Sequence, residues 1–198
     1  MHAVSTRGEL VLDRADGVHV WDVEGNRYVD AIAGLWYCNV GYGRDEIVDV
    51  AAAQMRRLSA YSNYGDLTTR PTSELADRIA GVAPMHDASV FFTSGGGESI
   101  ETAVKMARRY WSLVDEPDRT IVISRERAYH GLAGYGTSIV GTDAFTVGHG
   151  PLAGGTLRVP WDDAAALATA IDEVGAEHVA AFFCEPIIGA GGVLLPPD

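Results

Sequence analysis

The chain has 198 residues, of which 15 are basic and 27 acidic, so its formal net charge is −12. A chain of this length can bury a substantial core, and its negative charge repels nucleic-acid phosphates and anionic membrane surfaces. We therefore expect neither a nucleic-acid partner nor a membrane partner.

The two cysteines, Cys38 and Cys184, are far apart in the sequence, and each has apolar neighbours. Such a pair makes neither a disulfide framework nor a zinc site, so we expect no metal and a reducing compartment. The first residues carry no apolar run of signal-peptide length, and the run at 179–184 is ended by Glu185 and Pro186. The sequence therefore predicts a cytoplasmic protein.

The first third of the chain is expected to form an extended arm and a hairpin, followed by helices. Apolar and polar residues alternate at 18–21, and a turn at 24–26 leads into a returning segment at 27–30. Apolar residues then recur at helical spacing over 47–58, and a second helix is expected after Pro71.

From residue 89 onward, short apolar runs alternate with helices, which is typical of an α/β fold with parallel strands. A glycine-rich segment at 131–155 is expected to be a long loop that lines a site rather than part of the core. The expected strands lie at 90–92, 120–123, 157–159 and 179–184, and the expected helices follow the first strand as far as Trp111 and span 163–174.

The strand expected at 90–92 leads into Thr93-Ser94-Gly95-Gly96-Gly97-Glu98 and then into a helix. Consecutive glycines let main-chain amides approach an anion, and a helix N-terminus carries about half a positive charge. Residues 90–111 therefore predict a phosphate site. The glycines fit neither a P-loop, because no Lys-Ser/Thr pair follows them, nor a dinucleotide fingerprint, because Ile100 stands at the third glycine. A tight turn that needs glycine only for packing remains the alternative.

Three further features are candidates for the same site, each with a structural alternative. Tyr129 and His130 follow the strand at 120–123, at the end where open α/β sheets bind ligands, so Tyr129 could stack on a planar ring or pack on its own sheet. Glu185, after the last strand, could point into the site or form a strand-end ion pair. Trp36 belongs to an aromatic cluster whose alternative role is core packing.

Taken together and in this order, these segments resemble the class III (omega) aminotransferases, which are fold type I enzymes dependent on pyridoxal 5′-phosphate. The resemblance extends over residues 17–198, and the form of its second motif is similar to the subgroup that moves amino groups between omega-amino acids or amines and pyruvate. The motifs that carry it are Asp22-x-x-Gly25-x-x-Tyr28-x-Asp30, Leu35-Trp36-Tyr37-Cys38-Asn39-Val40-Gly41-Tyr42-Gly43, Phe91-Phe92-Thr93-Ser94-Gly95-Gly96-Gly97-Glu98, Ser124-Arg125 with Tyr129-His130-Gly131, and Glu185-Pro186-Ile187-Ile188-Gly189.

The resemblance implies a role for each candidate residue. One departure concerns Gly97, because the family usually has serine there, and the lost hydroxyl donor to the phosphate is worth about 1.5–3 kcal/mol. By the resemblance, Gly95, Gly96 and Gly97 hold the cofactor phosphate, Tyr129 stacks on the pyridine ring with His130 beside it, Glu185 is the catalytic acid beside the ring, and Trp36 lines the substrate pocket.

Transamination by this cofactor needs a lysine amine and an acid that keeps the pyridine nitrogen protonated. The only lysine, Lys105, lies about 13 Å along the helix from the glycines at 1.5 Å per residue, and we interpret it as a surface residue. In the family both groups come later in the sequence than the last residue here. The chain is thus interpreted as an N-terminal half that is inactive alone, with the arm and part of the small domain at 1–58 and the first half of the cofactor-binding large domain at 59–198.

Several alternatives stay open. The chain could be a truncation, one piece of a split enzyme, or a non-catalytic descendant that binds pyridoxal phosphate or assembles a dimer, and a sugar-phosphate domain is supported by the glycines alone. A half sheet leaves an edge uncovered, so we expect poor solubility, or association as a homodimer or with a missing C-terminal half. The expected small-molecule partners are an amino donor and a keto acid.

Overall fold

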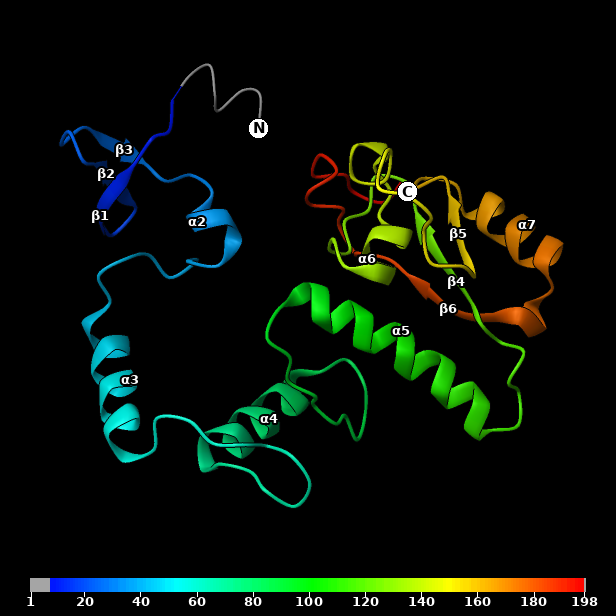
Figure 1. Ribbon diagram of the computed structural model, residues 1–198, viewed down its shortest axis with the longest axis horizontal. Coiled ribbons are helices and arrows are strands. Elements are labelled where there is room, and N and C mark those ends of the chain that lie inside the picture. The colour runs from blue at the N-terminus through cyan, green and yellow to red at the C-terminus, as the bar shows by residue number, and fades with distance from the viewer. Residues whose placement is uncertain (1–7, 198) are drawn as a thin grey trace. The chain divides into compact units, whose positions relative to one another are not determined.

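The computed structural model describes residues 8–197, which form two compact units divided between Ala88 and Ser89 (Figure 1). The expected boundary between residues 58 and 59 refers to the domains of a complete enzyme and stays a prediction. Within residues 8–197, no helix is long and apolar enough to cross a membrane.

The first unit begins with a three-stranded antiparallel sheet in the order β1-β2-β3. Its strands are β1 (Leu12–Asp16), β2 (His19–Asp22) and β3 (Arg27–Val29), and Val20 of β2 is buried. The pairing of Val20 with Tyr28 places β2 and β3 on either side of a tight turn, which confirms the predicted hairpin.

The turn of this hairpin is organised by the carboxylate of Asp22. It accepts hydrogen bonds from the main-chain N–H groups of Glu24 and Asn26 at 3.0 and 2.8 Å, from the Asn26 amide at 2.9 Å and from the Tyr28 hydroxyl at 2.8 Å. These bonds, that of Asn26 foremost, lower the pKa of Asp22. The spacing of Asp22, Gly25 and Tyr28 in the first motif is therefore the spacing of a hydrogen-bonded turn.

The short helix α2 (Ala33–Trp36) is a single turn with left-handed backbone angles. The φ angles are 48° at Ala33, 61° at Gly34, and 71° at both Leu35 and Trp36. Left-handed conformations cost about 1–2 kcal/mol per non-glycine residue, and such strain tends to persist at functional positions. Two helices follow, α3 (Asp45–Arg57) and α4 (Arg70–Val82), as predicted.

The second unit is built on a parallel sheet in the order β5-β4-β6. Its strands are β4 (Ile121–Arg125), β5 (Thr156–Val159) and β6 (Val179–Phe183), which confirms three of the predicted strands. The helix α5 (Gly96–Leu113) packs against β6, and α7 (Ala164–Val174) packs against β5 (Figure 1). Two short 3₁₀ turns complete the unit, η1 (Asp143–Phe145) and η2 (Ala176–His178).

Two expectations for this unit are corrected. Residues 90–92 form no strand, because their main chain finds no ladder partner among the described residues, and Phe91 is 70% exposed. The segment 131–155 is not simply a loop, because it contains the helix α6 (Gly134–Ile139) and Ile139 joins Val104 and Val122 in the buried core. The same segment also lines a cavity of about 370 Å³, as a site-lining role would require.

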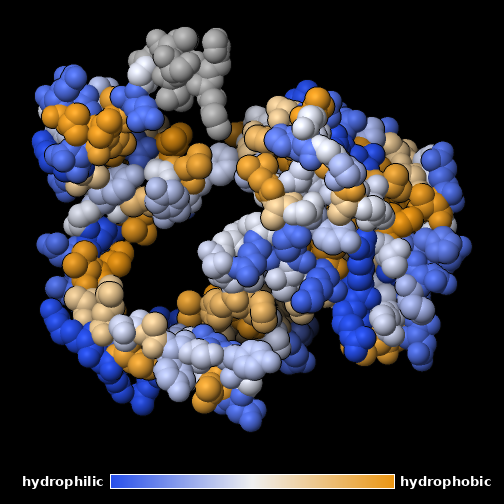
Figure 2. All heavy atoms as spheres, viewed as in Figure 1, coloured by the Kyte–Doolittle hydropathy of each residue, from blue (hydrophilic) through white to orange (hydrophobic). Residues whose placement is uncertain are grey.

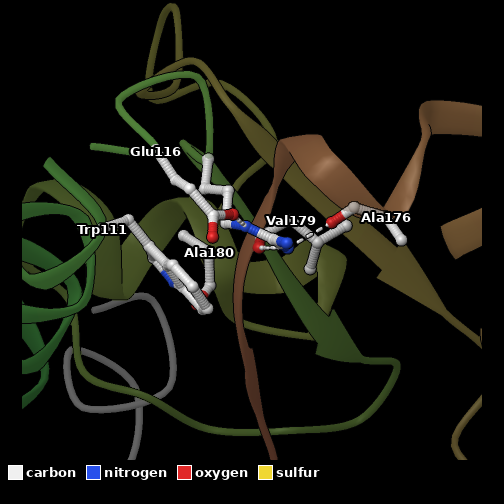
Figure 3. A network of polar contacts seen from close by, with 6 residues as sticks. Trp111, Glu116, Ala176, Val179 and Ala180 are labelled. Carbon is white, nitrogen blue, oxygen red and sulfur yellow. Dashed lines mark hydrogen bonds and ion pairs between the residues drawn. The ribbon is translucent and has the colours of Figure 1, made fainter. Parts of the chain in front are cut away.

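A polar network fastens the C-terminal end of α5 to the start of β6 (Figure 3). The Trp111 indole N–H donates to the Ala180 carbonyl at 2.7 Å, and the Arg119 guanidinium lies 4.3 Å from the Trp111 ring centre. Arg119 also donates to the Ala176 carbonyl at 2.5 Å and pairs with Glu116. The network fixes where α5 lies against the sheet, and with it where the helix begins.

Candidate functional site

A cavity of about 740 Å³ in the second unit is lined by residues from three separate segments. Gly96 and Gly97 come from the first turn of α5, Tyr129 and His130 from the loop after β4, and Glu185 from the segment after β6. The fold therefore brings five of the sequence-predicted site residues around one space. Gly95, the N-cap residue of α5, lies directly beside them.

The first turn of α5 presents main-chain amides to this cavity. The first N–H groups of a helix have no partner within the helix, and no side chain among the described residues accepts from those of Gly96 and Gly97. A Cβ atom built on Gly95, Gly96 or Gly97 would meet nothing within 4 Å, and Gly96 and Gly97 line the cavity, so this turn borders open space. Exposed amides at a helix start, beneath open space, suit an anion.

The acidic residue in this turn, Glu98, does not line the cavity. The Glu98 carboxylate accepts hydrogen bonds from the Ser94 hydroxyl and, at 2.9 Å, from the Ser94 N–H, and these bonds lower the pKa of Glu98. The negative charge of Glu98 is therefore stabilised by Ser94, the residue that precedes the glycines.

Gly97 also touches the loop that carries the aromatic residues. Gly131 has a φ angle of +95°, and a Cβ built on it would lie 2.9 Å from the Cα of Gly97. The loop after β4 can rest on the first turn of α5 because Gly131 has no side chain at this contact.

The turn that precedes Tyr129 packs closely against two further glycines, Gly141 and Gly191. Arg127 adopts a left-handed φ of 61°, and its N–H donates to the Gly141 carbonyl at 2.8 Å. A Cβ on Gly141 or on Gly191 would overlap the main chain of this turn. The Gly-rich segment after Glu185 therefore serves to pack against the turn before Tyr129.

Glu185 both points into the cavity and forms an ion pair, so its two predicted alternatives coexist. Its Oε1 accepts the Tyr129 N–H at 2.9 Å, and its Oε2 lies 4.0 Å from Nε2 of His130. The same Oε2 lies 3.7 Å from the Arg125 guanidinium, which also donates to the Glu185 carbonyl.

His130 is almost fully buried, and this determines its charge. Burial lowers the pKa of His130 from its ordinary value of 6.5, Glu185 acts to raise it, and Arg125 acts to lower it. At neutral pH the imidazole is therefore uncharged. Its Nε2 finds no hydrogen-bond partner within the described residues, and the Oε2 of Glu185 likewise has none.

Tyr129 does not pack on its own sheet. Its side chain is 41% exposed, and its ring meets Phe145 edge-on, with the ring centres 5.7 Å apart. One face of the ring can therefore meet a ligand in the cavity that Tyr129 lines.

Trp36 lies in the other compact unit, where its side chain is 56% exposed on the left-handed turn of α2. Its place in a substrate pocket stays a prediction. Lys105 is exposed on α5 and does not line the cavity. Residues 8–197 contain no cluster of histidine, cysteine or acidic side chains that could hold a metal ion.

Arg125 is the residue that sequence reasoning missed. It stands in the Ser124-Arg125 motif, but nothing in the sequence says that the ends of β4 and β6 lie side by side. The signal that could have found it is its position as the last residue of a strand that precedes a candidate site.

With this geometry established, comparisons with known proteins decide the family. The family model described as aminotransferase class-III matches residues 2–198. The chain belongs to the class III aminotransferases. This confirms the resemblance inferred from the motifs.

Relatives and solved structures agree with this assignment. A putrescine–pyruvate aminotransferase of Pseudomonas aeruginosa is 41% identical over 212 residues, which cover 98% of this chain and 46% of that protein. An (S)-enantioselective omega-transaminase from Thermomicrobium roseum superimposes with a TM-score of 0.94 at 40% identity, covering 100% of this chain and 48% of that one. An amine transaminase from an uncultivated Pseudomonas species, solved in its pyridoxal-phosphate-bound form, superimposes with a TM-score of 0.93 at 34% identity. The superposition covers 98% of this chain and 48% of that one.

The chain spans less than half the length of the curated relatives it matches. Together with its mixed helices and parallel sheet, the superpositions confirm the expected fold class, a partial fold type I α/β architecture.

Proposed function

We propose that this chain supplies the phosphate-binding part of a pyridoxal-phosphate-dependent aminotransferase, which moves an amino group between an amine or omega-amino acid and a keto acid such as pyruvate. The observation that carries the proposal is the single cavity around Gly96, Gly97, Tyr129 and Glu185 in a class III chain. Amino donor and keto acid are its small-molecule partners.

The residues fit the cofactor at both of its ends. The open amides of Gly95, Gly96 and Gly97 suit the phosphate, since an anion at a helix start gains from hydrogen bonds and from the helix dipole. The exposed face of Tyr129 suits a planar ring. His130 and Glu185 line the same cavity, and Nε2 of His130 and Oε2 of Glu185 are buried without a hydrogen-bond partner among the described residues. Such buried groups ordinarily find a partner.

The cofactor, when bound, supplies an electron sink for the amino-carrying carbon. This chain's residues bind and orient it: the glycines hold the phosphate, Tyr129 covers one ring face, and Glu185 is the charged group beside the ring. Because the cavity lining lacks a lysine and Lys105 is exposed elsewhere, we propose that the Schiff-base lysine and the ring-nitrogen acid come from sequence outside this chain. The chain alone is then inactive.

The substrate class follows from relatives and from one candidate residue. The putrescine–pyruvate activity in the name of the 41%-identical relative favours an amine donor and pyruvate as acceptor. We propose that Trp36, held on a strained turn, lines the pocket for the donor. We further propose a cytoplasmic homodimer for the complete enzyme.

Complementation tests this function. The chain is co-expressed with the C-terminal half of the Pseudomonas aeruginosa relative, and amino transfer from putrescine to pyruvate is measured. We expect activity only when both halves and pyridoxal phosphate are present, and reduced activity with Tyr129→Ala. Full activity with Tyr129→Ala, in a pair that still assembles, would contradict the assignment of the cavity.

The exposed position of Lys105 favours a second candidate, a non-catalytic module that holds pyridoxal phosphate without a covalent bond. Borohydride reduction separates the two. Binding by the chain that phosphate competes away and borohydride cannot trap, with no gain of activity from any C-terminal half, would favour the module.

A further inference from the structure

We infer that Arg125 is a positioning residue of the cavity, which fixes the carboxylate of Glu185 so that one oxygen holds the Tyr129 loop and the other faces His130. The inference deepens the proposed function, because it names a residue that orients the groups beside the cofactor. It rests on contacts among the buried His130 and the half-buried Arg125 and Glu185, which the sequence scatters over 60 residues.

Arg125 is placed by the sheet. It is the last residue of β4, and β4 pairs with β6 as far as Ser124 opposite Phe183, so Arg125 and Glu185 emerge at the same sheet end. The guanidinium donates to the Glu185 carbonyl and lies 3.7 Å from Oε2 of its carboxylate. One side chain thus holds both the main chain and the acid of the same residue.

The contact is shielded from water. The Arg125 side chain is only 13% exposed and that of Glu185 only 23%. Charges in such surroundings attract more strongly than at the surface, where ion pairs contribute little. A partner that is removed from such a pair leaves an uncompensated buried charge, so Glu185 depends on Arg125 for its position.

The orientation of Glu185 has two consequences for the cavity. Its Oε1 holds the N–H of Tyr129 at 2.9 Å, which fixes the start of the aromatic loop. Its Oε2 has no hydrogen-bond partner and lies 4.0 Å from the unpartnered Nε2 of His130. Arg125 thereby holds in place, beside the cavity, two buried polar atoms that have no hydrogen-bond partner among the described residues.

Histidine titration by NMR tests the arrangement without any cofactor. The charged groups facing His130 are Glu185, from the segment after β6, and Arg125, at the end of β4, and they act on its pKa in opposite directions. We expect Arg125→Gln to raise the pKa of His130 and Glu185→Gln to lower it further. The pKa of His130 in the double variant should fall between the values of the two single variants.

The pKa of His130 also distinguishes a variant that unfolds from one in which only the position of Glu185 changes. Unfolding would bring His130 in both single variants to the same, unperturbed value, and that result, or a wild-type pKa in Arg125→Gln, would overturn the inference. Because the titration needs no cofactor, it can succeed even if the proposed function fails.

A second experiment measures the binding of pyridoxal phosphate itself. We expect Arg125→Gln to weaken its binding about tenfold or more through misplacement of Tyr129, and Arg125→Lys to restore most of the affinity because it keeps the charge. Equal affinity of wild type and Arg125→Gln would also overturn the inference, provided that the wild type binds.

Discussion

Gly97 and Gly131 meet where the first turn of α5 touches the loop after β4, and only Gly131 must be glycine for this contact to form. Gly131 combines a left-handed φ of +95° with a Cβ position 2.9 Å from the Cα of Gly97, so no other residue fits there without a shift of the loop. Gly97 has no such constraint, because its own Cβ position is open. Packing therefore does not explain why this chain lacks a side chain at residue 97.

Gly97→Ser tests the missing hydroxyl. The new side chain has room, and a hydroxyl donor to a phosphate is worth about 1.5–3 kcal/mol, so we expect affinity for pyridoxal phosphate to rise by about tenfold or more. Fluorescence titration measures the change. Gly97→Ala, which adds only the methyl group, is the matched control and should bind like the wild type. A similar gain in both variants would show that the hydroxyl is not the cause.

At the scale of residues, sequence reasoning predicted those whose motifs carry their chemistry. Consecutive glycines before a helix, an aromatic residue after a strand and an acid after the next strand all indicate a site, and the structure brings them around one cavity. Arg125 could not be predicted, because its role depends on the neighbouring position of β4 and β6. The left-handed turn of α2 was also unforeseen, since Ala33, Leu35 and Trp36 have no intrinsic preference for that conformation.

Among the elements, the hairpin of β2 and β3 has a pH dependence that follows from Asp22. The pKa of Asp22 is lowered in the folded hairpin below its ordinary value of 3.8. Its contribution to stability is therefore complete above the unfolded pKa and is lost as the pH falls through the lower, folded value. We expect the protection of the main-chain amide protons of Glu24 and Asn26 against exchange with solvent, relative to an unfolded chain, to decrease below about pH 4.

NMR hydrogen exchange on two variants checks the cause. Asp22→Asn should show fast exchange at every pH, because the uncharged amide cannot accept the same four hydrogen bonds. Asp13→Asn changes an exposed carboxylate on β1 and should keep the wild-type profile. If the acid transition persists in Asp22→Asn, another group controls this turn.

The junction of α5 and β6 depends on Trp111. Trp111→Phe removes the N–H that binds the Ala180 carbonyl and weakens the contact with Arg119, so we expect the free energy of unfolding to fall by about 1–3 kcal/mol. Urea unfolding followed by circular dichroism measures it. Tyr110→Phe, in which the neighbouring exposed ring loses only its hydroxyl, should change stability little. Equal stability of Trp111→Phe and wild type would mean that the network in Figure 3 does not hold the junction.

The elements that sequence reasoning missed are those that depend on partners. Residues 90–92 have the apolar composition of a strand, yet a strand exists only where another main chain pairs with it, and the described residues provide none. The helix α6 was hidden by Gly134 and Gly136, which disfavour a helix in isolation. Gly136 is tolerated because the main chain of His130 and Gly131 lies too close to leave room for a Cβ.

For the molecule as a whole, apolar side chains remain at the surface of both units (Figure 2). Phe91 is 70% exposed beside the unpaired segment 90–92, and α3 and α4 bury none of their residues completely. Exposed apolar surface and unpaired main chain favour association.

We therefore expect the chain to self-associate in size-exclusion chromatography with light scattering, and to form a defined complex when the C-terminal half of the Pseudomonas aeruginosa relative is added. A well-folded monomer at high concentration would be the contrary result.

Whether the first turn of α5 holds the phosphate of pyridoxal phosphate can be measured by ³¹P NMR of that compound titrated with the chain. Gly97→Asp places a negative charge in the turn, and Gly81→Asp places the same charge on α4, where a Cβ is equally free of contacts. We expect a perturbed phosphorus signal with wild type and with Gly81→Asp, and an unperturbed one with Gly97→Asp. An unperturbed signal with wild type, or an equal perturbation with both variants, would contradict this placement of the phosphate.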